Sequence, residues 1–264
     1  MLVVIDLDGV VWLSEDPVPG SARAVARLRA AGHRVLFVTN NSQPTVTETV
    51  AKLEGFGVAA GRDDLCTSAQ AAASLTAPGD RVLVCAGPGV VEAVEERGAR
   101  PVEVPPAEVV IVGFHRHFDY DRLALAFAAV DGGARLVGTN DDPTYPTPEG
   151  PVPGGGSLLA AVAYAAGVEP VVAGKPHAPM AGLVRARMGL GPEAPLGEGL
   201  VVGDRPSTDG AMALRLGLPF HLVLTGVTEG AAGADPPPVA VWPDLAALAA
   251  GLGDGGSDTG QDTA

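Results

Sequence analysis

The sequence is poor in the residues that several classes of protein depend on. Of 264 residues only 17 are Lys or Arg, against 31 Asp or Glu, and the net charge is −14. Nucleic acids and anionic membranes are bound by basic surfaces, so this balance argues against both as partners. The charged fraction of 18% and the hydrophobic fraction of 47% are typical of a folded protein rather than a disordered one.

Long hydrophobic runs and cysteine pairs are also missing from the sequence. The nearest approach to a membrane span is 158–168, which is shorter than the roughly 18 residues that such a helix needs. The N-terminal run MLVVID has no basic start and is cut by Asp6, unlike a secretory signal. Cys66 and Cys85 form no CxxC motif, so we expect two buried reduced thiols. These features predict a soluble, cytoplasmic protein.

Lysine and asparagine are scarce, which draws attention to the few positions that keep them. The only lysines are Lys52 and Lys175, and the only asparagines are Asn40, Asn41 and Asn140. A residue type that is avoided elsewhere favours a local reason wherever it is retained.

Short β-branched runs alternate with segments of helical periodicity. Continuous apolar strands are typical of parallel sheets buried on both faces, so the alternation predicts an α/β fold, which binds ligands at the carboxyl ends of its strands. The expected strands are Leu2–Asp6, Arg34–Thr39, Arg81–Cys85, Val109–Val112, Arg135–Gly138, Pro170–Val172, Leu200–Gly203, Phe220–Leu224 and Val239–Trp242. The expected helices are Ser21–Ala31, Pro44–Glu54, Val90–Glu96, Tyr120–Val130, Ser157–Ala166, Met180–Met188, Thr208–Leu216 and Asp244–Ala250.

Two pairs of acids follow predicted strands. Asp6 and Asp8, in DLDG, end the first strand, where side chains two residues apart share a direction. Such a pair can attack a phosphorus atom and move protons, although D-x-D-G is also common in exposed turns and calcium loops. Asp204 follows a later strand and, with Asp6, can supply the hard oxygens that Mg²⁺ prefers. Asp209 also fits a plain acid at a helix N-terminus.

Two other strand ends carry groups that suit a phosphate. The turn Thr39-Asn40-Asn41-Ser42 offers a hydroxyl and successive backbone N–H groups, although we expect Ser42 to cap the following helix. Lys175, in GKP, offers a compact cation that can neutralise a nucleophile and a phosphate. Lys52 fits an ordinary surface lysine.

The joint order DLDGV, TNNS, GKP and GDRPSTD resembles the haloacid dehalogenase superfamily of phosphohydrolases. The stretch Gly138–Ala161 looks like the cap signature of its p-nitrophenyl phosphatase/NagD-like branch, and Val110–Tyr120 matches the same branch. The resemblance extends from about residue 2 to residue 245. It implies a Rossmann-like parallel-sheet core with a large inserted α/β cap domain.

The resemblance also assigns roles to the motifs. It implies that Asp6 is the nucleophile and that Asp8 is the general acid/base, and a base at position 8 favours hydrolysis over storage of an aspartyl-phosphate. The implied phosphate ligands are Thr39, Asn40, Asn41 and Lys175. Mg²⁺ is the implied cofactor, and its implied ligands are Asp6, Asp8 through its carbonyl, Asp204 and, in support, Asp209.

The spacing of the motifs indicates where the cap is inserted. A long stretch with its own strands and helices, 43–171, separates TNNS from the strand before GKP. We therefore expect a discontinuous core of residues 1–42 and 172–250, a cap of residues 43–171 and a disordered tail of residues 251–264. Such a cap restricts substrates to small molecules. Caps of this kind can carry a dimer surface, so a homodimer through the cap stays open.

Two cap residues depart from the branch. His115 stands in GFHRHF where the branch often has an acid, and a lone His is more often a surface or core residue than a substrate ligand. Tyr145, in DPTYP, stands where some relatives carry a substrate-facing His, and we expect it to bind substrate. These positions select the ester, so glycerol phosphate, phosphoglycolate, sugar phosphates and nucleoside monophosphates all stay open.

The prediction is a magnesium-dependent phosphatase that acts on a small phosphorylated metabolite through an aspartyl-phosphate at Asp6. One alternative is a phosphotransferase or mutase that passes the group to another acceptor. Another is a non-catalytic phosphate-binding regulatory module. Asp8 favours hydrolysis over both alternatives.

Overall fold

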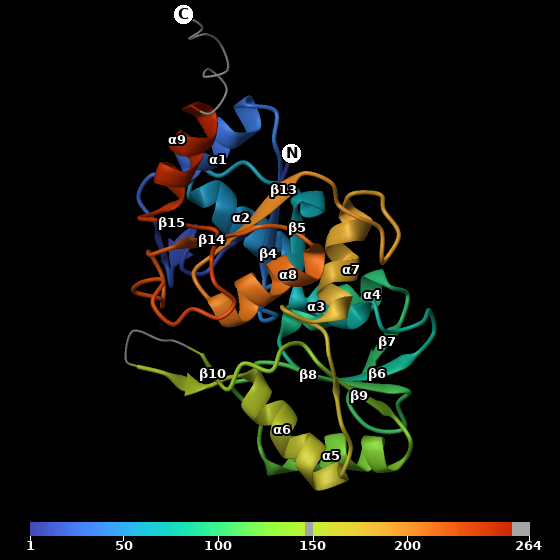
Figure 1. Cartoon of the computed structure of the whole chain (residues 1–264). Helices are drawn as coiled ribbons and strands as arrows, with labels where there is room; N and C mark the ends of the chain where they lie inside the picture. Colours follow the sequence, from blue (N-terminus) through green and yellow to red (C-terminus); the bar gives the residue numbers. More distant parts are fainter. Residues whose placement is uncertain (146–149, 255–264) are drawn as a thin grey trace, which may run out of the picture. The chain divides into compact units, whose positions relative to one another are not determined.

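The computed structural model describes residues 1–145 and 150–254. It is an α/β structure with helices packed on two main sheets (Figure 1). The larger sheet has the strand order β15-β14-β13-β1-β4-β5, and the second has the order β12-β9-β8-β6-β7. The pairs β1–β13, β13–β14 and β14–β15 are parallel, as is every pair in the second sheet. The predicted α/β class with parallel sheets is confirmed.

The elements follow one another closely along the chain. The strands are β1 (Leu2–Asp6), β2 (Trp12–Leu13), β3 (Asp16–Pro17), β4 (Arg34–Thr39), β5 (Leu65–Thr67), β6 (Arg81–Cys85), β7 (Arg100–Val102), β8 (Val109–Val112), β9 (Arg135–Gly138), β10 (Thr144–Tyr145), β11 (Val152–Pro153), β12 (Val171–Val172), β13 (Gly199–Gly203), β14 (Phe220–Val223) and β15 (Ala240–Trp242). The helices are α1 (Ser21–Ala30), α2 (Val46–Gly55), α3 (Ser68–Ala73), α4 (Pro88–Glu96), α5 (Tyr120–Asp131), α6 (Gly155–Ala166), α7 (Ala178–Arg187), α8 (Ala211–Leu216) and α9 (Leu245–Asp254). A 3₁₀ turn (Arg62–Asp64) and a π-helical turn (Pro206–Gly210) complete the regular structure.

The described chain divides into two compact units. The first contains Met1–Phe37, Lys52–Asp64 and the described residues from Pro195 onward, and the second contains Val38–Ala51 and Leu65–Ala194. The division into a core of residues 1–42 and 172–250 and a cap of residues 43–171 stays a prediction.

In the first unit, β1 is the best-buried strand, because all five of its residues are buried. It pairs with β13 in a register that sets Ile5 opposite Val202. Helix α1 buries the face formed by Ala24, Val25 and Leu28, as its spacing predicts, and it packs beside α9 (Figure 1). The strand that ends in Asp6 and the strand that Asp204 follows are therefore neighbours in a well-packed sheet.

In the second unit, the five-stranded sheet is covered by α5 and α6, which lie side by side (Figure 1). Its core consists mainly of β-branched and small side chains, with Leu83, Val110 and Val112 fully buried at the sheet and Val162 fully buried on α6. Both cysteines, Cys66 and Cys85, are buried, as expected.

Several element ends differ from the sequence expectations by one or two residues, and three differences are larger or bear on an expected role. Helix α9 continues to Asp254 and not to 250, and a side chain on Gly251 within it would begin 2.7 Å from the Trp242 ring. The first four residues of the predicted disordered tail are thus helical, and its remainder lies outside the described residues. Ser42 does not cap α2; Thr45 does, in a capping box in which its hydroxyl accepts the Glu48 N–H. The helix expected at 208–216 starts as a π-helical turn.

No helix in the described ranges is long and apolar enough to cross a membrane.

Candidate active site

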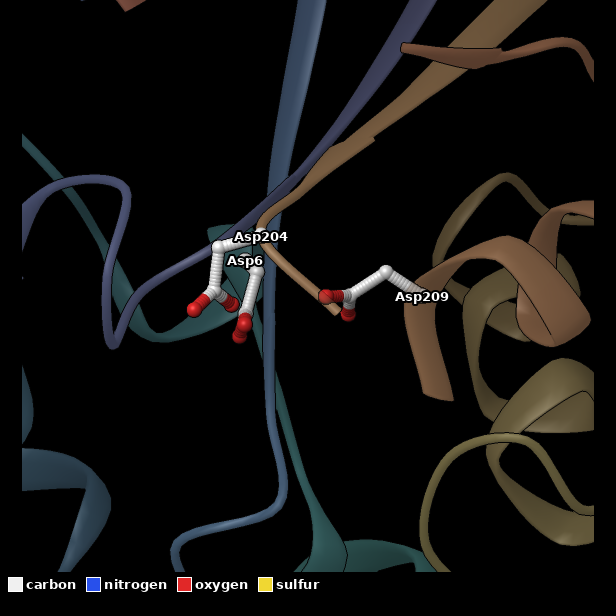
Figure 2. Close-up of side chains that lie close together, drawn as sticks. All are labelled: Asp6, Asp204 and Asp209. Atoms are coloured by element: carbon white, nitrogen blue, oxygen red, sulfur yellow. The ribbon is translucent and has the colours of Figure 1, made fainter. Parts of the chain in front are cut away.

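Three buried carboxylates meet at one edge of the larger sheet (Figure 2). Asp6 ends β1 and Asp204 directly follows β13, and these strands are parallel neighbours, so both side chains emerge at the same edge. Asp209 comes from the π-helical turn just beyond. One oxygen from each of the three lies within 4.8 Å of the others, and their residues are 8%, 3% and 0% exposed, respectively.

Glycines make room for two of these carboxylates. A side chain on Gly203 would place its first carbon 2.2 Å from the Asp209 carboxylate, and one on Gly226 would place it 1.9 Å from the carboxylate of Asp204. Gly9, which follows Asp8, has a φ of +82°, a backbone conformation that residues other than glycine rarely adopt. The backbone is thus built to bring the acids close together.

Backbone N–H groups fix the orientation of each carboxylate. Oδ1 of Asp6 accepts the N–H of the following residue, Leu7, at 2.8 Å. Oδ2 of Asp204 accepts the N–H of Val227 at 2.7 Å, and Oδ2 of Asp209 accepts that of Arg205 at 3.1 Å. The sequence did not indicate the contribution of the loop at 225–227, because that loop contains no acidic or basic residue.

The donor set fits a hard divalent cation. When ionised, three buried carboxylates so close together repel one another and lack water to stabilise their charge. A bound cation offsets this unfavourable electrostatic energy. Carboxylate oxygens are the ligands that Mg²⁺ and Ca²⁺ prefer. Among the described residues, this is the only group of His, Cys, Asp or Glu side chains with a metal-like spacing. The structure thus brings together Asp6, Asp204 and Asp209 as the sequence predicts.

Asp8 stands apart from this carboxylate group. It is half-buried and its Oδ1 accepts the indole N–H of Trp12 at 3.0 Å. Its side chain is therefore placed by a neighbour on the hairpin of β2 and β3, which sequence reasoning missed.

The predicted phosphate ligands come together in the second unit. Thr39 is buried at the end of β4, and its hydroxyl accepts the backbone N–H of Asn41 at 3.0 Å. Oδ1 of Asn40 accepts the N–H of Lys175 at 2.7 Å, and Nδ2 donates to the Lys175 carbonyl at 3.1 Å. The Lys175 side chain is almost fully buried, at 3% exposure, and its Nζ donates to the Val38 carbonyl at 3.4 Å.

Three further side chains support this group and were not predicted to do so. Nδ2 of Asn40 also donates to Oδ2 of Asp142 at 3.2 Å. The Asn40 carbonyl accepts the side chains of Ser68 at 2.7 Å and Asn140 at 2.9 Å. The scarcity of asparagine was the only available signal, and it pointed to Asn140.

The two cap residues singled out by sequence lie close to other rings. Tyr145, on β10, packs against Phe114 with ring centroids 5.1 Å apart. His115 is half-buried; its burial lowers the pKa of its imidazole, and the nearby charges of Arg122 and His117 lower it further. A role in substrate binding stays a prediction for Tyr145; for His115 the sequence favours a surface or core residue.

Comparison with known proteins gives the family of this chain. Residues 3–100 match the model of haloacid dehalogenase-like hydrolases, and residues 172–248 match a second model of the same kind of hydrolase. A 5'-nucleotidase of Bacillus subtilis is 34% identical over 229 residues, which cover 86% of this chain and 88% of that protein. The chain belongs to the haloacid dehalogenase-like hydrolases.

The individual relatives are phosphatases with different names. A D-glycerol 3-phosphate phosphatase of Mycobacterium tuberculosis is 39% identical over 86% of this chain, which spans only 64% of that protein's length. The structure of the glycerol phosphate phosphatase from that organism, solved with magnesium, covers 94% of this chain and 75% of its own at a TM-score of 0.83 and 37% identity. A p-nitrophenyl phosphatase from Archaeoglobus fulgidus covers 95% and 98% at a TM-score of 0.87 and 30% identity.

Proposed function

We propose that this protein is a magnesium-dependent phosphatase that hydrolyses small phosphate monoesters through an aspartyl-phosphate on Asp6. The observation that carries the proposal is the buried group of Asp6, Asp204 and Asp209 at the strand ends, with Asp8 two residues beyond the nucleophile. The phosphatases among the relatives support the same chemistry.

In this proposal the reaction has two steps. A carboxylate oxygen of Asp6 attacks phosphorus and the ester P–O bond breaks, while Asp8 gives its proton to the leaving oxygen. Asp8, now ionised, takes a proton from a water molecule that attacks the aspartyl-phosphate. The bond from phosphorus to Asp6 breaks, which restores the carboxylate and releases inorganic phosphate.

The other site residues bind the phosphoryl group or the metal. We propose that Thr39, Asn40, Asn41 and Lys175 bind the phosphoryl oxygens. Because both ends of its side-chain amide are engaged, Asn40 would offer the phosphate its backbone N–H and would hold Lys175 with its side chain. Mg²⁺ would be held by Asp6, the Asp8 carbonyl and Asp204, with Asp209 in support. When bound, the ion neutralises charge on the phosphoryl group and on the attacking carboxylate.

The test is phosphate release from p-nitrophenyl phosphate and a panel of small esters, with Mg²⁺ and with a chelator. We expect turnover with Mg²⁺ only, and none in Asp6→Asn. The matched control is Asp131→Asn, which changes an exposed acid at the end of α5 and should keep full activity. Absence of turnover on every ester overturns the proposal, and a phosphoryl group found on an added alcohol in place of free phosphate would indicate a transferase.

The panel also addresses the substrate. The named relatives include a glycerol phosphate phosphatase and a nucleotidase, so both kinds of ester belong in it. Tyr145 is proposed to contact the part of the substrate beyond the phosphate. A cytoplasmic location and a homodimer through the cap stay predictions, as does the exclusion of nucleic acid and membrane partners.

A further inference from the structure

The side chain of Trp12 connects the acidic loop after β1 to the hairpin of β2 and β3. Its indole N–H donates to Oδ1 of Asp8 at 3.0 Å, and its backbone carbonyl accepts the N–H of Gly9 at 2.7 Å. The residue is only 5% exposed, so the ring has little freedom. A carboxylate that accepts an N–H from a fixed ring has fewer orientations open to it.

Lys52, which the sequence alone assigns to the surface, lies over the face of this ring. Its Nζ lies 4.9 Å from the centre of the Trp12 ring and 5.9 Å from that of Phe56, and the two rings meet edge to face at 6.0 Å. A cation above an indole face is attracted by the negative charge of the π system. The ammonium group therefore favours one position of the ring.

The same ammonium group also anchors the tip of the hairpin. Nζ of Lys52 donates to the carbonyl of Ser14 at 2.7 Å, and Ser14 has a φ of 54°, an unfavourable conformation for a residue other than glycine. A second contact, to Glu15 at 3.3 Å, is with a side chain that is 90% exposed, so it adds little. Lys52 thus fixes both the ring and the loop that carries it.

We propose that Trp12 is the positioning residue of Asp8 and that Lys52 holds Trp12 in place. The inference rests on the proposed function, in which Asp8 exchanges a proton with the leaving oxygen and then with water. With Oδ1 bound to the indole N–H, the carboxyl group cannot rotate freely, and the oxygen that carries the proton keeps one direction. Removal of the N–H would leave the fold and the nucleophile intact but would slow the steps in which a proton moves.

The test compares two esters in Trp12→Phe, which keeps an aromatic ring and removes only the N–H donor. Nitrophenolate leaves without needing a proton, whereas an alkoxide needs one. We expect kcat/KM to fall about tenfold for an alkyl phosphate that the unaltered enzyme hydrolyses, and to stay within about twofold for p-nitrophenyl phosphate. For p-nitrophenyl phosphate kcat should still fall, because hydrolysis of the aspartyl-phosphate needs Asp8.

The matched control is Trp242→Phe, which changes the only other tryptophan. Trp242 lies on the sheet-edge strand β15, and its indole N–H donates to Nδ1 of His221 on β14 at 3.1 Å, so kcat/KM should change for neither ester. An equal fall in kcat/KM for both esters in Trp12→Phe, or no fall for either, would overturn the positioning role. If the unaltered enzyme hydrolyses no ester at all, the proposed function fails and this inference fails with it.

A second pair of variants decides the matter if Trp12→Phe does not fold. Lys52→Met removes the charge at similar length, and we expect the same difference between the two esters at about two- to threefold. Lys52→Arg keeps a cation and should restore most of the loss. An unchanged ester preference in Lys52→Met would contradict the proposed role of Lys52.

Discussion

The side-chain amide of Asn40 forms hydrogen bonds with both the N–H and the carbonyl of Lys175. Its Oδ1 accepts the Lys175 N–H at 2.7 Å, and its Nδ2 donates to the Lys175 carbonyl at 3.1 Å. Residues 135 positions apart in sequence are thus tied by a pair of hydrogen bonds. The segment that carries one of two lysines is held by one of three asparagines, which gives a physical reason for keeping both rare residues.

Asn40→Asp tests the role of these two hydrogen bonds. The variant keeps an acceptor for the Lys175 N–H but loses both amide donors, and it sets a carboxylate beside Asp142. Since like charges so close repel, we expect KM for p-nitrophenyl phosphate to rise about tenfold. Adding Asp142→Asn should recover part of the loss, and a double-mutant cycle measures the coupling. If the effects of Asn40→Asp and Asp142→Asn on KM are strictly additive, the proposed repulsion between the two side chains is contradicted.

Asp204→Asn tests the metal site. The substitution keeps the size of the side chain and removes one of three buried charges, so we expect the Mg²⁺ concentration for half-maximal activity to rise at least about tenfold. Calorimetric titration with Mg²⁺ measures the same loss without turnover. Asp131→Asn is the control, and an unchanged Mg²⁺ affinity in Asp204→Asn would place the ion elsewhere.

Gly203→Ala tests the close approach of Asp209. The new carbon would lie 2.2 Å from that carboxylate, so the turn must shift, and we expect a loss of about 1–3 kcal/mol in the free energy of unfolding together with weaker Mg²⁺ binding. Gly182→Ala, in helix α7, meets no atom within 4 Å and should stabilise by about 0.5–1 kcal/mol. Denaturant unfolding of both variants measures the contrast. Equal effects would contradict the steric argument.

Cys85 gives a pH-dependent term in stability. Burial raises the pKa of its thiol to about 12, so the folded protein keeps the proton when the unfolded chain, with a thiol pKa near 9, has lost it. Its contribution is complete below about pH 9 and is lost as pH rises toward 12. Urea unfolding should therefore show that the stability difference between the unaltered protein and Cys85→Ala shrinks between pH 8 and 10.5. A constant difference would contradict the burial of a neutral thiol.

The sequence predicted that Asp6 and Asp204 lie close together, because each comes at the end of a strand. Asp6 and Asp204 follow continuous apolar runs, and parallel neighbours must bring such ends together. Asp209 was expected at or near the first turn of a helix, and it lies in the π-helical turn directly before α8, where Gly203 leaves space for its carboxylate.

The supporting residues could not be predicted, because their roles depend on contacts between distant segments. Asp142 lies 102 positions from Asn40, and Ser68 begins a helix that follows a three-residue strand, β5, too short to show a pattern. Lys52 has the sequence surroundings of a surface lysine; only the fold sets it over the Trp12 ring.

The central claim is the aspartyl-phosphate on Asp6, and Asp8→Asn tests it most directly. In that variant the first step with p-nitrophenyl phosphate can proceed, since nitrophenolate needs no proton, but water cannot be activated. Enzyme quenched in acid after a short incubation with the ester and Mg²⁺ is digested and its peptides are analysed by mass spectrometry. We expect one phosphoryl group on the N-terminal peptide at Asp6, and none in the double variant with Asp6→Asn. An unphosphorylated Asp6 in an enzyme that still releases nitrophenol, or a phosphoryl group that persists after Asp6→Asn, would contradict it.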